Sequence, residues 1–432
     1  MSSEWQRIQL ADAPLTILDG DRGTNYPSQD EFTPSGHCLF LNTGNVTTEG
    51  FNFSNCAFIT AEKDAALRKG KLVCNDVVLT TRGTVGNVGY FHEGVRFTHV
   101  RINSGMVILR SDQFKLSSYF LYLFVRSTLF KEQVKLLQSG SAQPQLPIRD
   151  MKRIEIPLPP IDDQAAICDI LGTLDDRITL LRETNATLEA IAQAQFKSWF
   201  VDFDPVRAKM EGRLPVGMDE AMAALFPDSF EESELGLVPR GWSYVSLKEV
   251  VSIYDSKRVP LSGQEREKRQ GLYPYYGAAA LMDFVDDYLF DGIYLLTGED
   301  GSVANASGFS IMQYVWGKFW VNNHAHILQG KAGLATEHVM LALQGINITP
   351  YITGAVQAKL SQTNMWRINI LKPSLQLSEY FGSILEPLFV RFRHNAEQAK
   401  TLSTLRDTLL PRLISGQLRL PQAGSATREA LA

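Results

Sequence analysis

The chain has 432 residues, of which 44% are hydrophobic and 21% are charged. This predicts a globular protein of two or three domains rather than a disordered or fibrous one. No apolar run approaches the ~20 residues of a membrane-spanning helix, and the N-terminal MSSEWQRIQL lacks a signal-peptide core, so we expect no membrane association and a cytoplasmic location. The cysteines Cys38, Cys56, Cys74 and Cys168 show no CxxC spacing, which favours reduced thiols over a disulfide framework or a zinc site.

The net charge of −5 is unevenly distributed. Residues 200–239 carry nine acidic and three basic residues, whereas residues 63–115 carry nine basic and four acidic ones. The negative total therefore hides a basic region of the kind that steers anionic partners.

Short strands, helices and a linker are predicted along the chain. Residues 1–157 contain β-branched and aromatic runs such as KLVCNDVVLTT, separated by Gly-rich turns, and then a helical pattern over residues 116–138. Residues 158–204 predict a long amphipathic helix, and residues 205–240 predict a Pro/Gly-rich, acidic linker.

The second half repeats this organisation. Residues 241–371 predict a second mostly-β domain in which LATEHVMLALQGI forms a helix, residues 372–418 a second long helix, and residues 419–432 a flexible tail. The predicted fold class is therefore α+β. Two globular, mostly-β domains are separated by two long helices in a pseudo-two-fold internal repeat.

The repeat is visible in the letters. SGSAQPQLPIRDMKRIEI (139–156) recurs as TGAVQAKLSQTNMWRINI (353–370), with seven identities at a constant offset of 214. The match continues without a gap to positions 188 and 402, where the identities reach 15. Each half also begins with a similar segment, in which Trp5 matches Trp242 and Leu10 matches Leu247. The inserts between this opening segment and the repeated closing segment hardly match. A repeat of this size indicates tandem domains that share a frame and differ in their inserts.

The two long helices each carry a seven-residue apolar repeat, which is typical of a coiled coil. Each repeat contains one asparagine, Asn185 or Asn395. In an antiparallel pair in which residue i faces residue 580 − i, these asparagines meet and Leu188 faces Phe392. Since a buried Asn pair fixes register at a cost in stability, we predict an antiparallel coiled coil in this register. The alternative is that each helix packs on its own domain with its asparagine solvated.

Two dipeptides raise a further question about these helices. Gly172-Thr173 and Glu386-Pro387 lie at equivalent points, and a threonine N-cap or a first-turn proline would divide each helix into a short and a long piece.

Several motifs now point to one family. They are IEIPLPPIDDQAAICDILGTLDDRI, FKSWFVDFDPVRAKMEG, YPYYGAAALMDFVDDYLFDGIYLLTGEDGSV and LRDTLLPRLISGQL. With them, residues 4–420 resemble the specificity (S) subunit of a type I restriction-modification system. The DDQ at Asp162–Gln164 is a mild departure from the family's usual opening of the first helix.

The resemblance implies a role in phage defence and DNA methylation. Residues 1–157 and 241–371 would be target-recognition domains, each reading one half of a bipartite site in double-stranded DNA, with the helices as spacers. The implied partners are two methyltransferase subunits and restriction/translocase subunits. S-adenosylmethionine, ATP and Mg would bind to those partners, and this chain would hold no cofactor and catalyse nothing alone. Because the inserts differ, the target should be asymmetric.

The helix length agrees with such a spacer. Gln164 to Trp199 would span about 54 Å at ~1.5 Å per residue. Two modules held apart in this way can reach DNA segments about one turn, ~34–36 Å, apart.

Candidate DNA contacts lie in both inserts. Arginine suits guanine edges and phosphates, and tyrosine supplies a hydroxyl and a stacking face. In the first insert the candidates are Arg68, Lys69, Lys71, Arg82, Thr84, Arg96 and Arg101. In the second they are Lys257, Arg258, Arg266, Lys268, Arg269, Tyr273, Tyr275 and Tyr276. Runs of charged residues more often form solvent-exposed faces with no binding role, so this alternative stays open.

A partner-docking surface is also predicted. Phe196, Trp199, Phe200 and Phe203 follow one another at the end of the first helix. If exposed, such apolar residues would need cover, which the methyltransferase subunit could supply.

Other functions fit less well. A self-contained amino-methyltransferase needs Asp/Asn-Pro-Pro-Tyr/Phe, but the only Pro-Pro, Pro159-Pro160, is followed by Ile161. No GxxxxGK[ST] is present for a motor, GTVGNVG is better read as a β-turn than as a nucleotide site, and His324 and His326 lack an evident third metal ligand. The open alternatives are the specificity subunit of a type II system with a fused methyltransferase-nuclease and a protein-only coiled-coil scaffold. Salt-dependent DNA binding would separate the scaffold from the other two.

Overall fold

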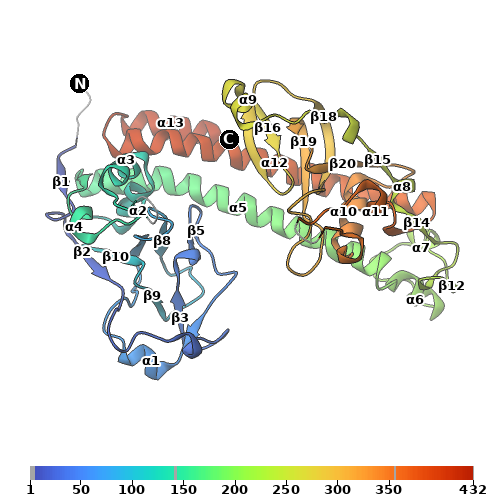
Figure 1. The fold of residues 1–432 in the computed structure, drawn as a ribbon, viewed down its shortest axis with the longest axis horizontal. Coiled ribbons are helices and arrows are strands. Elements are labelled where there is room, and N and C mark those ends of the chain that lie inside the picture. Colours follow the sequence, from blue (N-terminus) through green and yellow to red (C-terminus); the bar gives the residue numbers. More distant parts are fainter. Residues whose placement is uncertain (1–4, 141–143, 355–356, 432) are drawn as a thin grey trace. The chain divides into compact units, whose positions relative to one another are not determined.

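A computed structural model describes residues 5–140, 144–354 and 357–431 of the chain (Figure 1). The chain forms two compact units, Met1–Leu180 with Gln398–Ala432 (unit 1) and Leu181–Glu397 (unit 2). Each unit thus combines one globular region with part of each long helix. Gln143 of the repeat lies outside the described residues.

Unit 1 is built on short strands. They are β1 (Arg7–Gln9), β2 (Leu15–Asp19), β3 (Cys38–Leu41), β4 (Val46–Thr47), β5 (Gly50–Phe51), β6 (Phe58–Ile59), β7 (Asp76–Thr80), β8 (Val88–Phe91), β9 (Val100–Ile102), β10 (Met106–Ser111) and β11 (Glu155–Pro157). One sheet has the order β2-β10-β7-β8, and a second has the order β6-β3-β9 with β3 and β9 parallel. The central strand β7, DVVLT, is buried throughout, as expected of a strand covered on both faces.

The helices of unit 1 lie around these sheets. They are α1 (Ala61–Ala66), α2 (Ser118–Arg126), α3 (Thr128–Leu137), α4 (Ile148–Met151) and the 3-10 turns η1 (Gln29–Glu31) and η2 (Thr43–Asn45). The single helix predicted over residues 116–138 is divided at Ser127, whose backbone is extended. The Ser127 hydroxyl accepts from the Phe130 N–H, so this serine caps α3 and ends α2.

Unit 2 contains one large sheet. Its strands are β12 (Phe230–Ser233), β13 (Gly236–Pro239), β14 (Ser243–Ser246), β15 (Val251–Ile253), β16 (Gln270–Tyr276), β17 (Leu281–Val285), β18 (Phe290–Gly298), β19 (Met312–Val321), β20 (Ala325–Gly330) and β21 (Asn369–Lys372). Six of them pair in the order β15-β20-β18-β19-β16-β17. The short helices are α6 (Asp204–Met210), α7 (Glu220–Ala224), α8 (Leu247–Val250), α9 (Gly263–Lys268), α10 (Thr336–Gln344), α11 (Gln362–Met365), η3 (Asp255–Lys257) and η4 (Thr349–Tyr351).

The repeated letters form the same ladder in both units. β1 pairs antiparallel with β11, with Ile8 opposite Ile156, and β14 pairs with β21, with Val245 opposite Ile370. These are the pairs that the sequence offsets of 237 and 214 make equivalent. The next residue after β1 or β14 also bonds alike in the two units. The Leu10 N–H donates to the Ile154 carbonyl, and the Leu247 N–H donates to the Ile368 carbonyl, both at 2.8 Å. The frame is therefore duplicated down to its hydrogen-bond register, although one unit has a four-stranded sheet and the other a six-stranded sheet.

A second duplicated feature is a pair of glycine turns. Gly83 and Gly140 have φ of 71° and 89°, and their equivalents Gly301 and Gly354 have φ of 78° and 93°. In this left-handed region only glycine is unstrained. β-bridges join Arg82 to Gln145 and Asp300 to Lys359 beside these turns. Each unit thus presents the same turn with different side chains.

The long helices α5 (Ile161–Phe200) and α12 (Leu375–Ile414) are each continuous over 40 residues. This overturns the alternative of divided helices. Thr173 does not cap a helix, because its hydroxyl donates to the Asp169 carbonyl 2.7 Å away. Pro387 lies inside α12, and Leu385 and Phe389 on either side of it are buried in the core of unit 2.

Within unit 2, α5 and α12 run antiparallel. Asn395 Nδ2 donates to Asn185 Oδ1 at 2.9 Å, and the rings of Trp199 and Phe381 lie 5.4 Å apart. Both pairs have residue numbers that sum to 580. Asn185 Nδ2 also donates to the Phe392 carbonyl at 3.0 Å, so the half-buried Asn185 and the buried Asn395 are both hydrogen-bonded.

The C-terminal residues differ from the expected flexible tail. Leu420–Leu431 form helix α13, with Ala423 and Thr427 buried. Among the described helices, none combines the length and apolarity needed to cross a membrane.

Candidate nucleic-acid interface

Two predicted DNA contacts of unit 1 lie on the duplicated glycine turn. Arg82 and Thr84 follow β7 and are exposed. Arg82 lines a hollow of about 260 Å³ together with Arg22, Asp19 and Gln145. Arg22 was not a candidate from sequence, because the isolated GDRG stretch carries no signal beyond a turn.

The prediction that Arg101 contacts DNA is wrong. Its side chain is only 6% exposed and is ion-paired with the buried Asp64. It also donates to three backbone carbonyls, those of Asp64, Leu67 and Lys69. Burial alone raises the pKa of Asp64, but hydrogen bonds from Lys71 and Arg101 outweigh burial and lower it to about 2. Arg101 therefore braces the interior of unit 1 instead of facing DNA.

The other cations of unit 1 remain at the surface. Lys69 is exposed, and Lys71 is partly engaged by Asp64. Arg96 is exposed, lies over the Phe97 ring at 4.6 Å and donates to the Phe53 carbonyl at 3.1 Å. Lys69 and Arg96 can contact an anionic partner without giving up a buried partner, whereas Lys71 would share its charge with the buried Asp64.

In unit 2 the arginines of the predicted basic stretch are largely neutralised. Arg266 pairs with Asp283 at 3.1 Å, and Arg269 pairs with Asp286 at 2.8 Å. The charge run lies on α9 and in the turn after it. Lys268, the last residue of α9, is exposed. Lys257 is also exposed and lies 5.3 Å from the centre of the Tyr254 ring.

The three tyrosines of this stretch separate into two roles. Tyr275 is 1% exposed and its hydroxyl accepts from the Leu261 N–H at 2.9 Å, so the expectation that it contacts DNA is contradicted by its burial in the core. Tyr273 and Tyr276 are half-buried. Burial raises the pKa of Tyr276, which keeps its hydroxyl protonated as a donor.

Arg258 belongs to an internal ion network. Its guanidinium bonds Glu299 at 2.6 Å and lies 3.5 Å from Asp255. The buried His326 contacts Asp255 through Nδ1 at 2.6 Å and the Leu360 carbonyl through Nε2 at 2.8 Å. Burial alone lowers the pKa of His326, but the bond to Asp255 outweighs burial and raises it. Among the described residues, Asp255, Glu299 and His326 are placed as metal ligands could be, yet Arg258 already supplies the positive charge between the two carboxylates.

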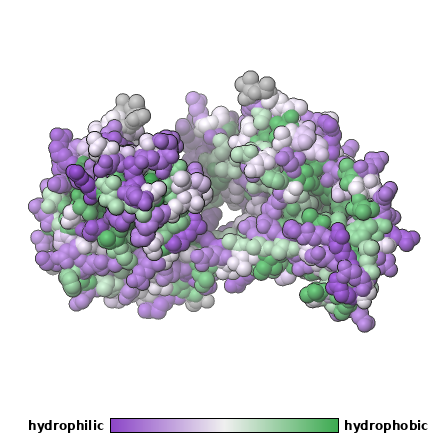
Figure 2. All heavy atoms as spheres, turned by 90° about the horizontal axis from the view of Figure 1, so that it is seen from below, coloured by the Kyte–Doolittle hydropathy of each residue, from purple (hydrophilic) through white to green (hydrophobic). Residues whose placement is uncertain are grey.

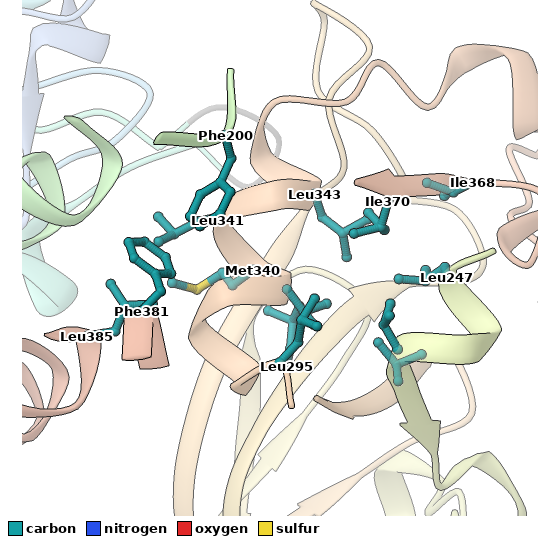
Figure 3. Close-up of a cluster of buried hydrophobic side chains, with 14 of the residues drawn as sticks. Phe200, Leu247, Leu295, Met340, Leu341, Leu343, Ile368, Ile370, Phe381 and Leu385 are labelled. Atoms are coloured by element: carbon teal, nitrogen blue, oxygen red, sulfur yellow. The ribbon is translucent and has the colours of Figure 1, made fainter. Parts of the chain in front are cut away.

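The predicted docking surface at the end of α5 is also corrected. Trp199 and Phe200 are 2% and 5% exposed and belong to the core of unit 2, with Phe196 and Phe203 packed against it. Figure 3 shows Phe200 and Phe381 pointing toward one another beside Leu341 and Met340. These rings are covered by α10 and α12 of the same unit, so they need no partner. Figure 2 shows one face of the molecule, on which hydrophilic residues predominate and hydrophobic residues form smaller patches.

Comparison with known proteins supplies the family. The sequence matches the type I restriction modification DNA specificity domain twice, over residues 3–190 and 239–403. The chain belongs to this family. The two matches coincide with the two copies of the frame described above.

Individual type I specificity subunits are similar along most of the chain. The HindI specificity subunit of Haemophilus influenzae is 23% identical over 485 residues, covering 96% of this chain and 100% of the relative. The MjaIX specificity subunit of Methanocaldococcus jannaschii is 24% identical over 362 residues, covering 80% and 78% of the two chains. The structure of the type I S subunit from M. genitalium matches with a TM-score of 0.56 at 18% identity over 96% of this chain and 97% of the other, which shows a shared fold.

Proposed function

We propose that this chain recognises DNA for a type I restriction-modification system, with unit 1 reading one half of a bipartite target and unit 2 reading the other. The observation that carries the proposal is the duplicated frame. The same strand register and the same glycine turns hold two different sheets. Two different reading surfaces on one chain match an asymmetric target.

The contacts proposed for each unit are the exposed members of the predicted sets. In unit 1 they are Arg68, Lys69, Lys71, Arg82, Thr84 and Arg96, and in unit 2 they are Lys257 and Lys268. Arg266, Arg269, Tyr273 and Tyr276 are partly covered and would contribute from the edge of the surface. Side chains of this length and charge suit phosphates and base edges.

The catalytic steps belong to partner subunits in this proposal. S subunits are the non-catalytic specificity components of type I systems and associate with DNA, methyltransferase and restriction subunits. We extend this to two methyltransferase subunits for this chain, since it offers two copies of the frame, and to restriction/translocase subunits in the cytoplasm. S-adenosylmethionine, ATP and Mg would be bound by those subunits.

The experiment is methylation mapping. The chain is expressed with its neighbouring methyltransferase gene in a host without modification systems of its own, and N6-methyladenine is mapped across the genome. One bipartite, asymmetric motif that disappears without this gene is the expected result. Methylation that persists without the gene, or a motif with one defined half, would contradict the proposal.

Two measurements bear on the alternatives. A pull-down with this chain would recover a fused methyltransferase-nuclease in a type II arrangement, and in the methylation mapping a protein-only scaffold would leave the pattern unchanged. Family membership favours DNA recognition over the scaffold.

A further inference from the structure

Asp21 is a buried carboxylate that ties two loops of unit 1 together. It is 8% exposed and follows β2. One carboxylate oxygen accepts from the Gly23 N–H at 2.8 Å, and the other accepts from the N–H groups of Arg68 and Lys69 at 2.7 and 3.3 Å. The hydrogen bonds from Gly23 and Arg68 lower the pKa of Asp21. The carboxylate therefore stays charged and joins the turn at residues 20–23 to the turn at residues 68–70.

The two joined loops turn three cations outward. Arg68 and Lys69 are exposed, and the Arg22 side chain is 50% exposed. Arg22 forms an exposed ion pair with Asp19 at 3.2 Å and donates to the Ser104 carbonyl at 3.3 Å. The Asp21 carboxylate is hydrogen-bonded to backbone N–H groups, and an exposed ion pair such as Arg22–Asp19 contributes little to stability, so these cationic side chains can exchange their contacts for phosphate.

The backbone beneath the cations is closely packed. A Cβ on Gly70 would lie 3.1 Å from the Ile102 carbonyl oxygen and 3.3 Å from the Cα of Gly20. The buried Arg101 also donates to the Lys69 carbonyl at 2.7 Å. The loops are thus held from below by Asp21 and Arg101, which places the cationic side chains on a rigid base.

The cations also border the hollow beside the glycine turn. Arg22 and Arg82 both line this hollow of about 260 Å³. Arg22 therefore connects the Arg68–Lys69 turn to a residue already proposed to contact DNA. Asp19 lines the same hollow, so one carboxylate lies beside the two arginines there.

We propose that Arg22, Arg68 and Lys69 bind the phosphate backbone of DNA and that Asp21 is the positioning residue of this cluster. The proposal rests on the proposed function and adds the chemical class of the contact. Exposed, long and flexible cations on a fixed backbone suit phosphates, which set orientation and carry no sequence information. The cluster would hold unit 1 on DNA while other residues read the bases.

The first test is Arg22→Ala in the full chain with its methyltransferase partner. Binding is measured with a fluorescein-labelled duplex carrying the mapped target and with a duplex lacking it, across a series of salt concentrations. Loss of one phosphate contact should weaken both complexes about three- to tenfold and make the salt slope less steep by about 0.9. The ratio of the two affinities should stay unchanged. Lys135→Ala, at an exposed site on α3, is the matched control and should leave the slope as it is.

The second test is Asp21→Asn, which separates position from charge. The variant removes a negative charge beside three cations, so electrostatics alone predicts tighter DNA binding. Loss of the carboxylate that holds both loops predicts weaker binding, about threefold or more, at a temperature well below the thermal unfolding midpoint of unit 1 in the variant. Tighter or equal binding by Asp21→Asn would overturn the positioning role.

The outcomes for the cluster and for the proposed function differ. Wild-type protein that binds DNA while Arg22→Ala and an Arg68→Ala/Lys69→Ala double variant keep the full salt slope would overturn the cluster alone. Wild-type protein that binds neither duplex would overturn the proposed function. If Asp21→Asn does not fold, the salt slopes of the surface variants still decide the proposal.

Discussion

Arg82 and Arg101 show how one residue type takes opposite roles within one insert. Arg82 is exposed on a glycine turn, whereas Arg101 is buried against Asp64 and donates hydrogen bonds to three backbone carbonyls. In sequence both are cations near β-branched residues. What distinguishes them is the acid that the fold brings to Arg101 from α1, 37 positions away.

We predict that Arg101→Ala destabilises the protein by about 3–5 kcal/mol, since the buried Asp64 would lose its buried partner and keep only the more exposed Lys71 and His37. Arg96→Ala is the control and should cost about 1 kcal/mol or less, because this arginine is exposed and contributes a ring contact. Urea unfolding measures both. An unchanged unfolding midpoint together with lost DNA binding would return Arg101 to the set of DNA contacts.

His338 predicts a pH dependence. This histidine on α10 is fully buried among Phe196, Phe200 and Phe381, and its Nδ1 has no partner among the described residues. Burial lowers its pKa to about 3 from the usual 6.5. Below pH 6.5 the unfolded chain therefore binds a proton that the folded chain refuses, so the free energy of unfolding falls as the pH falls toward 3.

We predict a loss of about 2 kcal/mol from this group between pH 6.5 and pH 5. His338→Met should remove this part of the pH dependence, and at pH 7 it should be neutral or stabilising because an unpaired buried nitrogen disappears. The half-exposed His324→Gln serves as the control. Unfolding midpoints at pH 7 and pH 5 give the comparison, and equal pH dependence in wild type and His338→Met would contradict the assignment.

At the scale of elements, α5 and α12 are the long helices that the heptad pattern predicts. The pattern allows several registers, and the paired asparagines favour one of them. The structure places Asn185 and Asn395 within hydrogen-bond distance in that arrangement. A second polar contact between the same helices, inside unit 1, joins Asp175 to Arg406 and to Arg126 of α2. Polar groups that match only one partner favour a single register over its neighbours.

We predict that changing Asn185 and Asn395 together to Leu keeps the helices folded and loosens control of the distance between half-sites. Methylation of duplexes whose half-sites differ in separation by one base pair measures this. Asn395→Leu alone should lower the free energy of unfolding by about 1–3 kcal/mol, because the Asn185 side-chain Oδ1 loses the hydrogen bond from Asn395. Undiminished discrimination by the double variant would remove the asparagines from any role in spacing.

At the scale of the whole molecule, the chain is two units with separate cores that share a frame. The core of unit 2 includes Trp199, Leu295, Met340 and Phe381, and a separate cluster in unit 1 includes Leu41, Val78 and Ile108. Arg82 belongs to unit 1, and Lys268 belongs to unit 2. Their effects on DNA binding are therefore expected to be independent.

We predict that Arg82→Ala and Lys268→Ala have additive effects on the free energy of DNA binding, within about 0.5 kcal/mol. Each should relax the methylated motif in one half only. Binding titrations of the two single variants and the double variant, with methylation mapping, provide the test. A coupling well beyond this limit would mean that the two residues contact one common site.

The sequence by itself determined the duplicated frame, the two long helices and the family, because these depend on periodicity and on repeated letters that survive without knowledge of contacts. Only the tertiary structure decided which polar and aromatic residues face outward. Arg101 and Tyr275 are buried, Trp199 and Phe200 lie in the core of unit 2, and Arg22 is exposed beside the hollow. The physical reason is that an ion pair or an aromatic cluster forms between residues far apart in the chain. No local pattern of charge or hydrophobicity records which partner each side chain meets.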